Sequence, residues 1–446
     1  MSDTENTSEK LDFTIETLGP CKVTSTVPLS KTKEGKQSDF VSDEEYILFD
    51  IEGGGVLPSE PLSKEQVLEL AGPREQIYFD PTKCHAAIVT CGGLCPGLND
   101  VIRSIVMCLW YRYGVRRISG IRYGYRGFLS ECGIPSMELT PDIVSEIHTK
   151  GGTILGSSRG YGNRPGDIVD SMQRMGINIL FGIGGDGTQK GMLGIAEEIK
   201  KRGLKIAVVG IPKTIDNDLS FIQKSFGFET AVSKAVDAVS TAHVEAFCAV
   251  NGIGIVKVMG RQSGYIAAHT ALAINDVNYV LVPEVPFDLE GSNGLLEHLE
   301  KRIQYRHHAV ILIAEGAGQD LIPDTGKIDA SGNKVLSDVG VFLKDKISQH
   351  FKSKNIEVNI RYIDPSYIIR GTPANSNDAI YCQRLGTNAV HAAMAGKTSL
   401  LISLVHNHLV HLPIQMAVSR KNAIDPEGHL WRDVIDATGQ PLMMKN

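Results

Sequence analysis

The sequence predicts an α/β protein whose sheets are largely parallel. From about His85 onward, short runs rich in β-branched residues alternate with stretches whose apolar residues follow helical spacing. Strands that alternate with helices in this way form parallel sheets covered by helices on both faces. The chain has 446 residues, which is long enough for two or three domains with cores of their own. Ligands bind such folds where the carboxyl ends of strands meet loops, so the motifs at those positions carry the functional prediction.

Seven runs are predicted to be buried strands, and one helix is especially well marked. The strands are HAAIVT (85–90), RRISGI (116–121), NILFGI (178–183), KIAVVGI (205–211), GIGIVKV (252–258), YVLVPEV (279–285) and AVILIAE (309–315). The helix lies within 188–203, where Met192, Ile195, Ala196 and Ile199 follow helical spacing and Gly203 stops the helix.

The first 82 residues differ from the rest of the chain in their pattern of residue types. They hold few periodic apolar positions and several clusters of Ser, Thr, Pro and Gly, including GGG at 53–55. We therefore expect an N-terminal extension, residues 1–82, that wraps the surface of a partner.

Composition and charge exclude several classes of function. The net charge of -6, from 51 acidic and 45 basic residues, gives no polycationic surface for nucleic acid. Of the eight cysteines only Cys91 and Cys95 lie close together, without a second Cys or His pair, which favours reduced thiols over a zinc site. The N-terminus is polar and acidic, and no apolar run approaches the roughly 20 residues that span a bilayer. We expect a cytoplasmic protein that binds neither nucleic acid nor membrane.

The sharpest motif is GIGGDGTQKG, residues 182–191, which follows one predicted strand and opens into the helix above. Its glycines let backbone amides approach phosphate oxygens at a helix N-terminus, where the helix dipole favours an anion. Asp186 would repel a phosphate unless a cation intervened, so we interpret it as a Mg²⁺ ligand. The structural alternative is a turn with a capping Asp. A dinucleotide loop at Gly182, Gly184 and Gly187 is a poor alternative, because Asp186 would face the pyrophosphate.

A second motif, PKTIDND at 212–218, follows the strand predicted at 205–211. Asp216 and Asp218 are two residues apart, so in an extended loop their side chains point the same way. One of them can accept a proton from an attacking hydroxyl, while Thr214 and Lys213 contact phosphate oxygens. The alternative is an ordinary turn rich in Asp and Asn.

Seven motifs occur in an order that resembles a known family. They are CGGLCPGLN (91–99), GSSRG (156–160), GGDGT (184–188), PKTIDND (212–218), MGRQSG (259–264), AEGAG (314–318) and YIIRGTPANSNDA (367–379). From about residue 84 to past residue 400, the chain resembles the phosphofructokinase family. This resemblance implies two similar three-layer α/β domains, an active site in the cleft between them, and a homotetramer. The nucleotide domain would be 83–230, joined by parts of 371–446, and the sugar-phosphate domain 231–370.

The resemblance also assigns the nucleotide-binding residues by motif position. It implies ATP-binding residues Gly93, Arg159, Arg164, Gly185, Asp186, Gly187, Thr188 and Gly191, with Asp186 holding the cofactor Mg²⁺. Gly93 resembles the residue that lets the ATP phosphates approach the first loop, and Arg159 looks like the arginine on those phosphates.

The sugar-phosphate residues are assigned in the same way. The resemblance implies a fructose 6-phosphate site of Thr214, Asp216, Asp218, Met259, Gly260, Arg261, Glu315, Arg361, Tyr367 and Arg370, and a catalytic set of Asp216, Asp218, Thr214, Lys213 and Arg261. Asp216 resembles the general base, and Arg361 and Arg370 resemble the pair on the 6-phosphate. Tyr367 stands where many members have His. Gly252 stands where bacterial members have another phosphate-binding arginine, and Lys213 is the candidate to supply that charge.

The implied reaction is transfer of the γ-phosphoryl group of ATP to the 1-hydroxyl of fructose 6-phosphate in glycolysis. GGDGT also occurs in kinases of NAD and of lipids, but these would lack MGRQSG and the Arg370 segment. A catalytically dead regulatory subunit would be expected to lose Asp186 or Asp216, and both remain. A pyrophosphate-dependent enzyme stays the alternative, because Lys213 is the residue type found in those relatives. Gly187, in contrast, leaves space for the α-phosphate and ribose of ATP.

Regulation is predicted only in outline. Arg103 has a counterpart among the arginines of the bacterial effector site, but Met107 replaces the next one on the same helix. We expect an allosteric enzyme that does not respond to the bacterial effectors.

Overall fold

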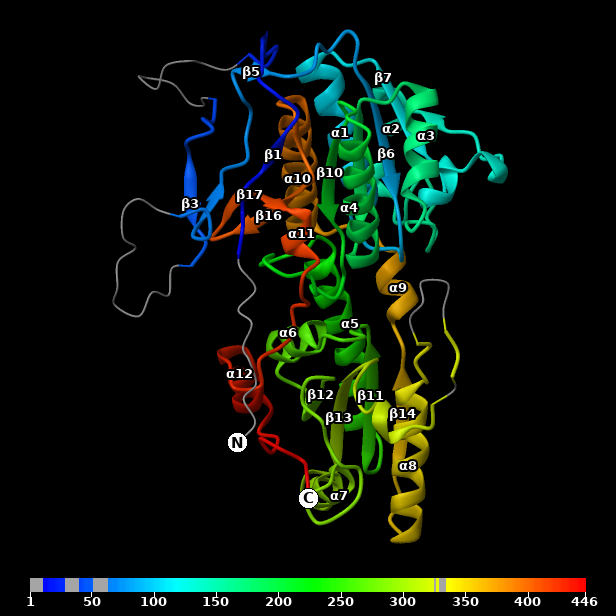
Figure 1. Cartoon of the computed structure of the whole chain (residues 1–446). Coiled ribbons are helices and arrows are strands. Elements are labelled where there is room, and N and C mark those ends of the chain that lie inside the picture. Colours follow the sequence, from blue (N-terminus) through cyan, green and yellow to red (C-terminus); the bar gives the residue numbers. More distant parts are fainter. Residues whose placement is uncertain (1–10, 29–39, 51–62, 325, 329–333) are drawn as a thin grey trace.

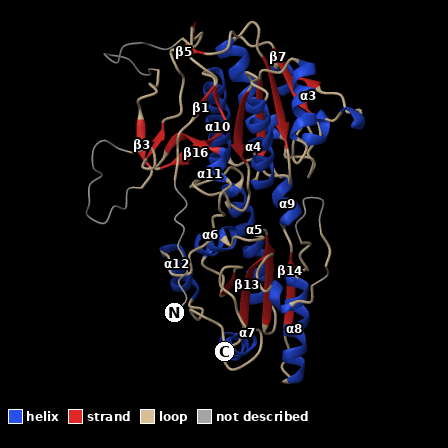
Figure 2. Ribbon diagram, in the orientation of Figure 1, coloured by secondary structure: helices blue, strands red, loops and turns tan. Residues whose placement is uncertain are grey.

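A computed structural model of the chain describes residues 11–28, 40–50, 63–324, 326–328 and 334–446. Figure 1 shows an elongated molecule with one sheet and its helices at one end, here called the larger half, and a second sheet at the other end, the smaller half. Helices pack beside the strands in both halves (Figure 2). None of the described helices is long and apolar enough to cross a membrane.

The larger half is built on a seven-stranded sheet in the order β17-β16-β10-β9-β6-β7-β8. The strands are β6 (His85–Thr90), β7 (Arg117–Ile121), β8 (Met137–Glu138), β9 (Ile179–Gly184), β10 (Ala207–Pro212), β16 (Leu400–Val405) and β17 (His408–Pro413). All pairings are parallel except those of the two edge strands, β8 and β17. The two faces carry alternate residues: Ile88 packs in the core under α1 and α10, and Val89 in the core under α3 and α4.

The helices of this half are long and amphipathic. They are α1 (Leu98–Met107), α3 (Pro165–Met175), α4 (Asp186–Lys201) and α10 (Ser376–Met394), with short helices α2 (Pro141–Val144), α11 (Ile414–Ala417), η1 (Cys108–Tyr113), η2 (Gly124–Phe128), η3 (Ser130–Cys132) and η4 (Ile147–Thr149). α4 buries Met192, Ile195 and Ile199, the residues whose spacing predicted it, and it begins two residues earlier than predicted.

The smaller half is built on four parallel strands in the order β12-β13-β11-β14. They are β11 (Gly252–Val258), β12 (Tyr279–Leu281), β13 (His308–Ala314) and β14 (Asn359–Ile363), packed with α5 (Phe228–Phe247), α6 (Tyr265–Ile274), α7 (Leu295–Arg306), α8 (Val339–Ser353), α9 (Ser366–Gly371), α12 (His429–Thr438) and η5 (Gln319–Leu321). Val256 faces the core with α5 and α6, and Ile255 faces the core with α7 and α8. Each sheet is therefore the middle layer of three.

The seven predicted strands all exist, with one shortened. The run predicted at 279–285 ends as a strand at Leu281, two residues before Pro283, which has no backbone N–H to donate. The strands β14, β16 and β17 were not predicted from the sequence.

The N-terminal extension packs on the chain's own larger half. Its short strands are β1 (Glu16–Thr17), β2 (Val23–Thr24), β3 (Tyr46–Leu48), β4 (Val67–Glu69) and β5 (Gln76–Ile77), and β1 pairs with β15 (Lys397–Thr398). Phe13 and Leu68 are buried in the larger half's core, and Glu69 accepts hydrogen bonds from Arg74 and Lys397. The described part thus packs on its own chain, and its contact with a partner stays a prediction; the glycine run at 53–55 lies outside the described residues.

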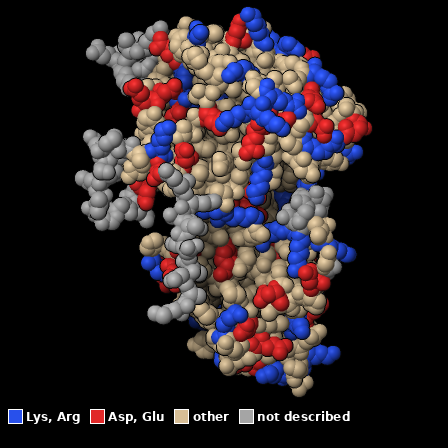
Figure 3. Space-filling model, in the orientation of Figure 1, with Lys and Arg blue, Asp and Glu red and all other residues tan. Residues whose placement is uncertain are grey.

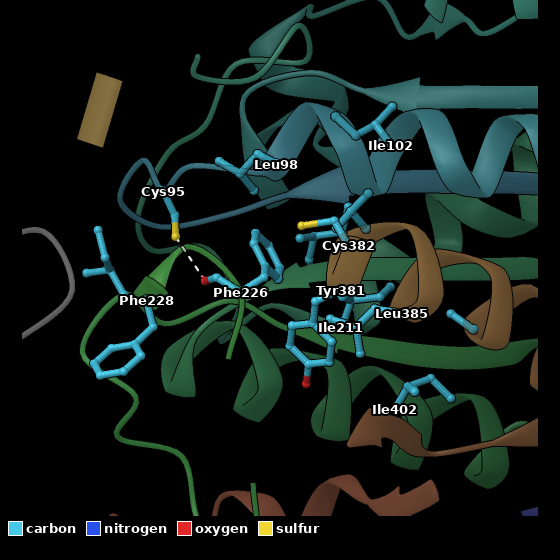
Figure 4. Close-up of a cluster of buried hydrophobic side chains, with 14 of the residues drawn as sticks. Cys95, Leu98, Ile102, Ile211, Phe226, Phe228, Tyr381, Cys382, Leu385 and Ile402 are labelled. Atoms are coloured by element: carbon cyan, nitrogen blue, oxygen red, sulfur yellow. Dashed lines mark hydrogen bonds between the residues drawn. The ribbon is translucent and has the colours of Figure 1, made fainter. Parts of the chain in front are cut away.

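A close-packed core supports the loop that carries CGGLCPG. Figure 4 shows this core, with Leu98 on α1, Cys382 on α10 and Phe226 ahead of α5 pointing toward one another. Cys95 donates a hydrogen bond from Sγ to the Phe226 carbonyl oxygen at 3.3 Å. A Cβ at Gly97, whose φ is +98°, would lie 2.6 Å from the Cys382 sulfur. The packing therefore fixes the loop just beneath the site described next.

Candidate active site

A cavity of about 740 Å³ lies where the loops of the larger half meet the smaller half. It is lined by the loops at 91–93 and 158–163, by Gly185 and the start of α4, and by Tyr125, Lys213 and Arg261. Figure 3 shows basic side chains gathered at the waist between the two halves. The predicted ATP-binding residues line this cavity with one exception, Arg164.

The glycine-rich loop between β9 and α4 has the geometry of an anion site. Gly185 is the N-cap residue and has no side chain, so the first amides of α4 are not capped by one. A Cβ at Gly187 would meet nothing within 4 Å, so this glycine opens directly onto free space. At Gly191, in contrast, a Cβ would lie 2.7 Å from the Tyr125 ring. Gly187 therefore leaves room for a ligand, whereas Gly191 leaves room for Tyr125.

Asp186 fits a magnesium ion that arrives with a phosphorylated ligand. Its Oδ2 accepts a hydrogen bond from Lys190 Nζ at 3.0 Å, one helical turn further along α4. Among the described residues no three His, Cys, Asp or Glu side chains are grouped to hold a metal alone. Mg²⁺ in phosphate-transfer sites commonly takes one or two carboxylates, with waters and substrate phosphates completing its octahedron. A single cavity-facing carboxylate suits that mode of binding. The spacing of Asp186 and Lys190 could have revealed Lys190, which the sequence reasoning missed.

A buried glutamine joins the two loops that carry the predicted carboxylates. Gln189 Nε2 donates to the carbonyl oxygens of Gly184 at 3.0 Å and Ile211 at 3.2 Å, at the ends of β9 and β10. This side chain also escaped the sequence reasoning, because its two acceptors are backbone groups.

The PKTIDND motif forms a tight turn, which corrects the prediction of an extended loop. Asn217 has a φ of +56°, and its amide donates to the Thr214 carbonyl oxygen at 3.3 Å. The Thr214 hydroxyl donates to the Asp218 carboxylate, and Ser225 donates from its amide to the Asn217 side chain. The turn is therefore fixed by its own hydrogen bonds, with Asn in the left-handed conformation that this residue tolerates.

Asp216 has the properties of a proton acceptor. Burial, together with the charges of Asp218 and Glu315, raises its pKa to about 7, against the opposing effects of Arg370 and the Arg261 amide. Its Oδ1 atom is buried and has no hydrogen-bond partner among the described residues. A carboxylate with a pKa near neutrality can take and return a proton at physiological pH.

Lys213 is a buried cation that lines the cavity. Its buried ammonium donates to the Gly93 carbonyl oxygen at 2.7 Å. Burial lowers its pKa, as do the charges of Arg159 and Arg370. Lys213 and Arg261 line the cavity, whereas Asp216 is not one of its lining residues.

In the smaller half, four predicted sugar-site residues follow two neighbouring strands. Met259, Gly260 and Arg261 follow β11, Glu315 follows β13, and the Gly316 amide donates to the Gly260 carbonyl oxygen at 3.0 Å. The carboxyl ends of parallel strands meet at one edge, which explains why these residues come together.

The two halves meet at the turn formed by residues 212–218. Ser263 Oγ, from the loop after β11, donates to the Asp216 carbonyl oxygen at 3.0 Å. Arg261 donates to the Lys334 carbonyl oxygen.

Three of the predicted site residues lie away from the cavity and from the turn that carries Asp216. Arg164 pairs with Glu131 and with Asp167, and it does not line the cavity. Arg361 is on the edge strand β14, half-exposed, with its Nε 3.4 Å from the Glu245 carboxylate. Tyr367 is 84% exposed on α9. Arg370, on the same short helix, does interact electrostatically with Asp216 and Lys213.

The fold and the cavity define an α/β protein suited to binding phosphate groups. The helix amides at Gly185 have no side-chain cap, Lys and Arg side chains line the cavity, and Asp216 is a buried carboxylate. The chain belongs to the phosphofructokinase family, whose family model matches residues 85–393. It is 57% identical to the ATP-dependent 6-phosphofructokinase of Borreliella burgdorferi, across 98% of this chain and 99% of that protein. It is 44% identical to the ATP-dependent 6-phosphofructokinase of Amycolatopsis methanolica, across 96% of this chain and 95% of that one.

Among solved structures, the fold is similar to a pyrophosphate-dependent phosphofructokinase from Marinobacter aquaeolei. The TM-score is 0.65 at 20% identity, across 80% of this chain and 91% of that chain, and the likeness concerns the fold alone. The family and the fold class predicted from the sequence are confirmed.

Proposed function

We propose that the chain is an ATP-dependent 6-phosphofructokinase that converts fructose 6-phosphate and ATP into fructose 1,6-bisphosphate and ADP in glycolysis. The observation that carries the proposal is Asp216, a buried carboxylate of near-neutral pKa beside a cavity that has phosphate-binding geometry. The two relatives at 57% and 44% identity, both named for this ATP-dependent activity, support the choice of donor.

In this reaction Asp216 accepts the proton of the sugar 1-hydroxyl as its oxygen attacks the γ-phosphorus. The bond from that phosphorus to the β,γ-bridging oxygen breaks, and ADP leaves. Lys213, Arg159 and Arg261 lie where they can bind phosphate oxygens, and phosphoryl transfer depends chiefly on such positioning and charge neutralisation. Mg²⁺, held near Asp186, would neutralise charge on the transferred group. Thr214 and Asp218 hold the turn that presents Asp216.

A pyrophosphate donor is the second candidate, because the family resemblance associates a lysine at the position of Lys213 with pyrophosphate-dependent members. Its charge lies in the cavity and would serve either donor. The open space at Gly187 favours ATP, because the α-phosphate and ribose need room that a side chain would take.

The test is a coupled assay of the purified full-length chain with fructose 6-phosphate and Mg²⁺, comparing ATP with pyrophosphate. We expect turnover with ATP, with fructose 1,6-bisphosphate as the product, and none with pyrophosphate. Turnover with pyrophosphate alone, or with neither donor, would refute the proposal.

We propose that the protein is a homotetramer in the cytoplasm. Exposed apolar side chains on α9 and α10, namely Tyr367, Ile368 and Ile380, support association with further copies of the chain. The number of four copies is what the family resemblance implies. Light scattering of the purified chain measures its mass and tests this directly. A cytoplasmic location fits a glycolytic role and is checked by fractionation of the source cells.

A further inference from the structure

The segment that crosses from the larger half to the smaller half contacts the turn at residues 212–218. We call this turn the catalytic turn, because it carries Asp216. It leaves α11, which packs on α4 and β17, and reaches α12, which packs on α6 and β12. Figure 1 shows it descending between these two helices through the waist of the molecule. We call residues 418–428 the crossover segment.

Asn422 of the crossover segment is bonded to the catalytic turn. The backbone amide of Asn422 donates to the Asp218 carbonyl oxygen at 3.0 Å, and the side-chain Nδ2 lies 3.5 Å from the Asn217 carbonyl oxygen. The neighbouring residue Lys421 forms an antiparallel bridge with Leu219. The backbone that presents Asp216 and Asp218 is therefore bonded on one side to a segment some 200 residues further along the chain.

The same asparagine is bonded to the smaller half. Tyr265, at the start of α6, donates from its hydroxyl to Asn422 Oδ1 at 3.1 Å and lies 2.9 Å from the Ala423 carbonyl oxygen. Burial and the charge of Glu284 raise the pKa of Tyr265 to about 12, so the hydroxyl keeps its proton and acts as a donor. The Asn422 amide is thus oriented with its oxygen toward Tyr265 and its nitrogen toward the turn.

Glu284 makes a second hydrogen-bonded contact between the crossover segment and the smaller half. Its Oε1 accepts from the amides of Gly264 and Ile424, both at 2.9 Å. Gly264 follows the loop whose Ser263 hydroxyl donates to the Asp216 carbonyl oxygen. A closed set of contacts therefore links the turn, Asn422 and the loop after β11.

We propose that Asn422 is a positioning residue that fixes the catalytic turn to the smaller half. This inference rests on the proposed function. Asn422 touches no substrate and acts by holding the backbone of Asp216 and Asp218 in position. Loss of the side-chain amide would remove the contacts of Asn422 with the Asn217 carbonyl oxygen and with Tyr265, while the backbone bond to Asp218 stays. One side of the turn would then be held less firmly, and small misplacements of reacting groups are costly in rate.

The charged groups around Asp216 make this role visible in a pH profile. Asp218 and Glu315 face it with negative charge, and Arg370 with positive charge, while the Arg261 amide points at it. A looser turn would admit water and separate Asp216 from Asp218. Both changes lower the pKa of Asp216 toward its ordinary value.

The experiment compares three full-length variants with the wild type: Asn422→Ala, Tyr265→Phe and, as a matched control, Glu427→Ala on the exposed part of the crossover segment. We expect Asn422→Ala to lower kcat about tenfold, with the KM for ATP nearly unchanged and the acid limb of kcat moved to lower pH. Tyr265→Phe, which removes one hydroxyl, should do the same to a smaller extent. Glu427→Ala should leave all three quantities unchanged.

Hydrogen exchange of peptides covering residues 213–225 gives a readout independent of activity. Exchange should quicken in Asn422→Ala and Tyr265→Phe and stay the same in the control. An active wild type whose Asn422→Ala variant keeps both its pH profile and its exchange rates would overturn the inference. An inactive wild type with faster exchange in Asn422→Ala would instead refute the proposed function and leave the positional contact established.

Discussion

The larger and smaller halves of the molecule differ in how many of their predicted site residues they bring together. In the larger half, the loops that follow β6 and β9 converge on one cavity, and the predicted nucleotide residues line it apart from Arg164. In the smaller half, Met259 and Glu315 follow adjacent strands, but Arg361 and Tyr367 face solvent. Residues at the carboxyl ends of central strands are brought together by topology, whereas residues within an edge strand or on an outer helix face are not. On the proposed assignment of the site, one chain therefore brings together the residues of the nucleotide side but does not bring Arg361 and Tyr367 to the 6-phosphate side.

The largest effect is expected where the two halves meet, at Asp216. Asp216→Asn should lower kcat about a thousandfold and change both KM values little, because a general base acts in the transition state. Steady-state kinetics measure this, and a kcat near the wild-type value would remove Asp216 from its role.

The same variant should be more stable at alkaline pH. The folded state raises the pKa of Asp216 to about 7, so ionisation opposes folding and stability is lost as pH rises from about 4 toward 7. A carboxamide has no such cost, and the melting temperature of Asp216→Asn at pH 8 should exceed that of the wild type. A lower melting temperature would mean that Asp216 supports the fold instead.

On the nucleotide side, Gly187→Asp should reduce ATP-dependent activity at least about a hundredfold. A carboxylate close to the α-phosphate repels it by several kcal/mol in a partly dry site. Since a Cβ at Gly187 meets no atom, the melting temperature should not change. Gly191→Ala is the matched control: its Cβ would crowd Tyr125, so it should lose stability without a change of donor. Unchanged use of ATP by Gly187→Asp would contradict this interpretation of the free space.

On the sugar side, Arg370→Ala should raise the KM for fructose 6-phosphate about thirtyfold, because a charge-assisted contact contributes about 2 kcal/mol in ground and transition states alike. The KM for ATP should change much less. A change confined to the ATP constant would place Arg370 on the nucleotide side.

Arg361 tests whether the 6-phosphate side is completed by a second copy of the chain. Arg361 pairs with Glu245 and does not line the cavity of its own chain, so we propose that it acts on the 6-phosphate bound by a neighbouring copy. We expect Arg361→Ala to raise the sugar KM about tenfold. Mixed oligomers of Arg361→Ala with Asp216→Asn should regain sites of wild-type sugar affinity, because each chain supplies what the other lacks. A sugar KM unaffected by Arg361→Ala would show that one chain suffices.

Much of this arrangement could be predicted from the sequence, and the exceptions have physical causes. The strand–helix alternation predicted seven strands of the two main sheets, because local periodicity determines which elements form, but it did not predict β14, β16 and β17. The turn at Asn217 could not be predicted, since its positive φ is set by hydrogen bonds to Thr214 and Ser225. Asn422 escaped notice because its partners lie far away in the chain. The packing of the extension did so for the same reason, as the bridge between Leu70 and Val410 illustrates.

The pH dependence of kcat tests most directly the claim that Asp216, at the junction of the halves, is the base. In the wild type, kcat with ATP and fructose 6-phosphate should rise about tenfold per pH unit up to about pH 7 and then level off, because only the ionised carboxylate accepts the proton. The residual activity of Asp216→Asn should lack this inflection. A flat wild-type profile across this range, or the same inflection in Asp216→Asn, would contradict the account.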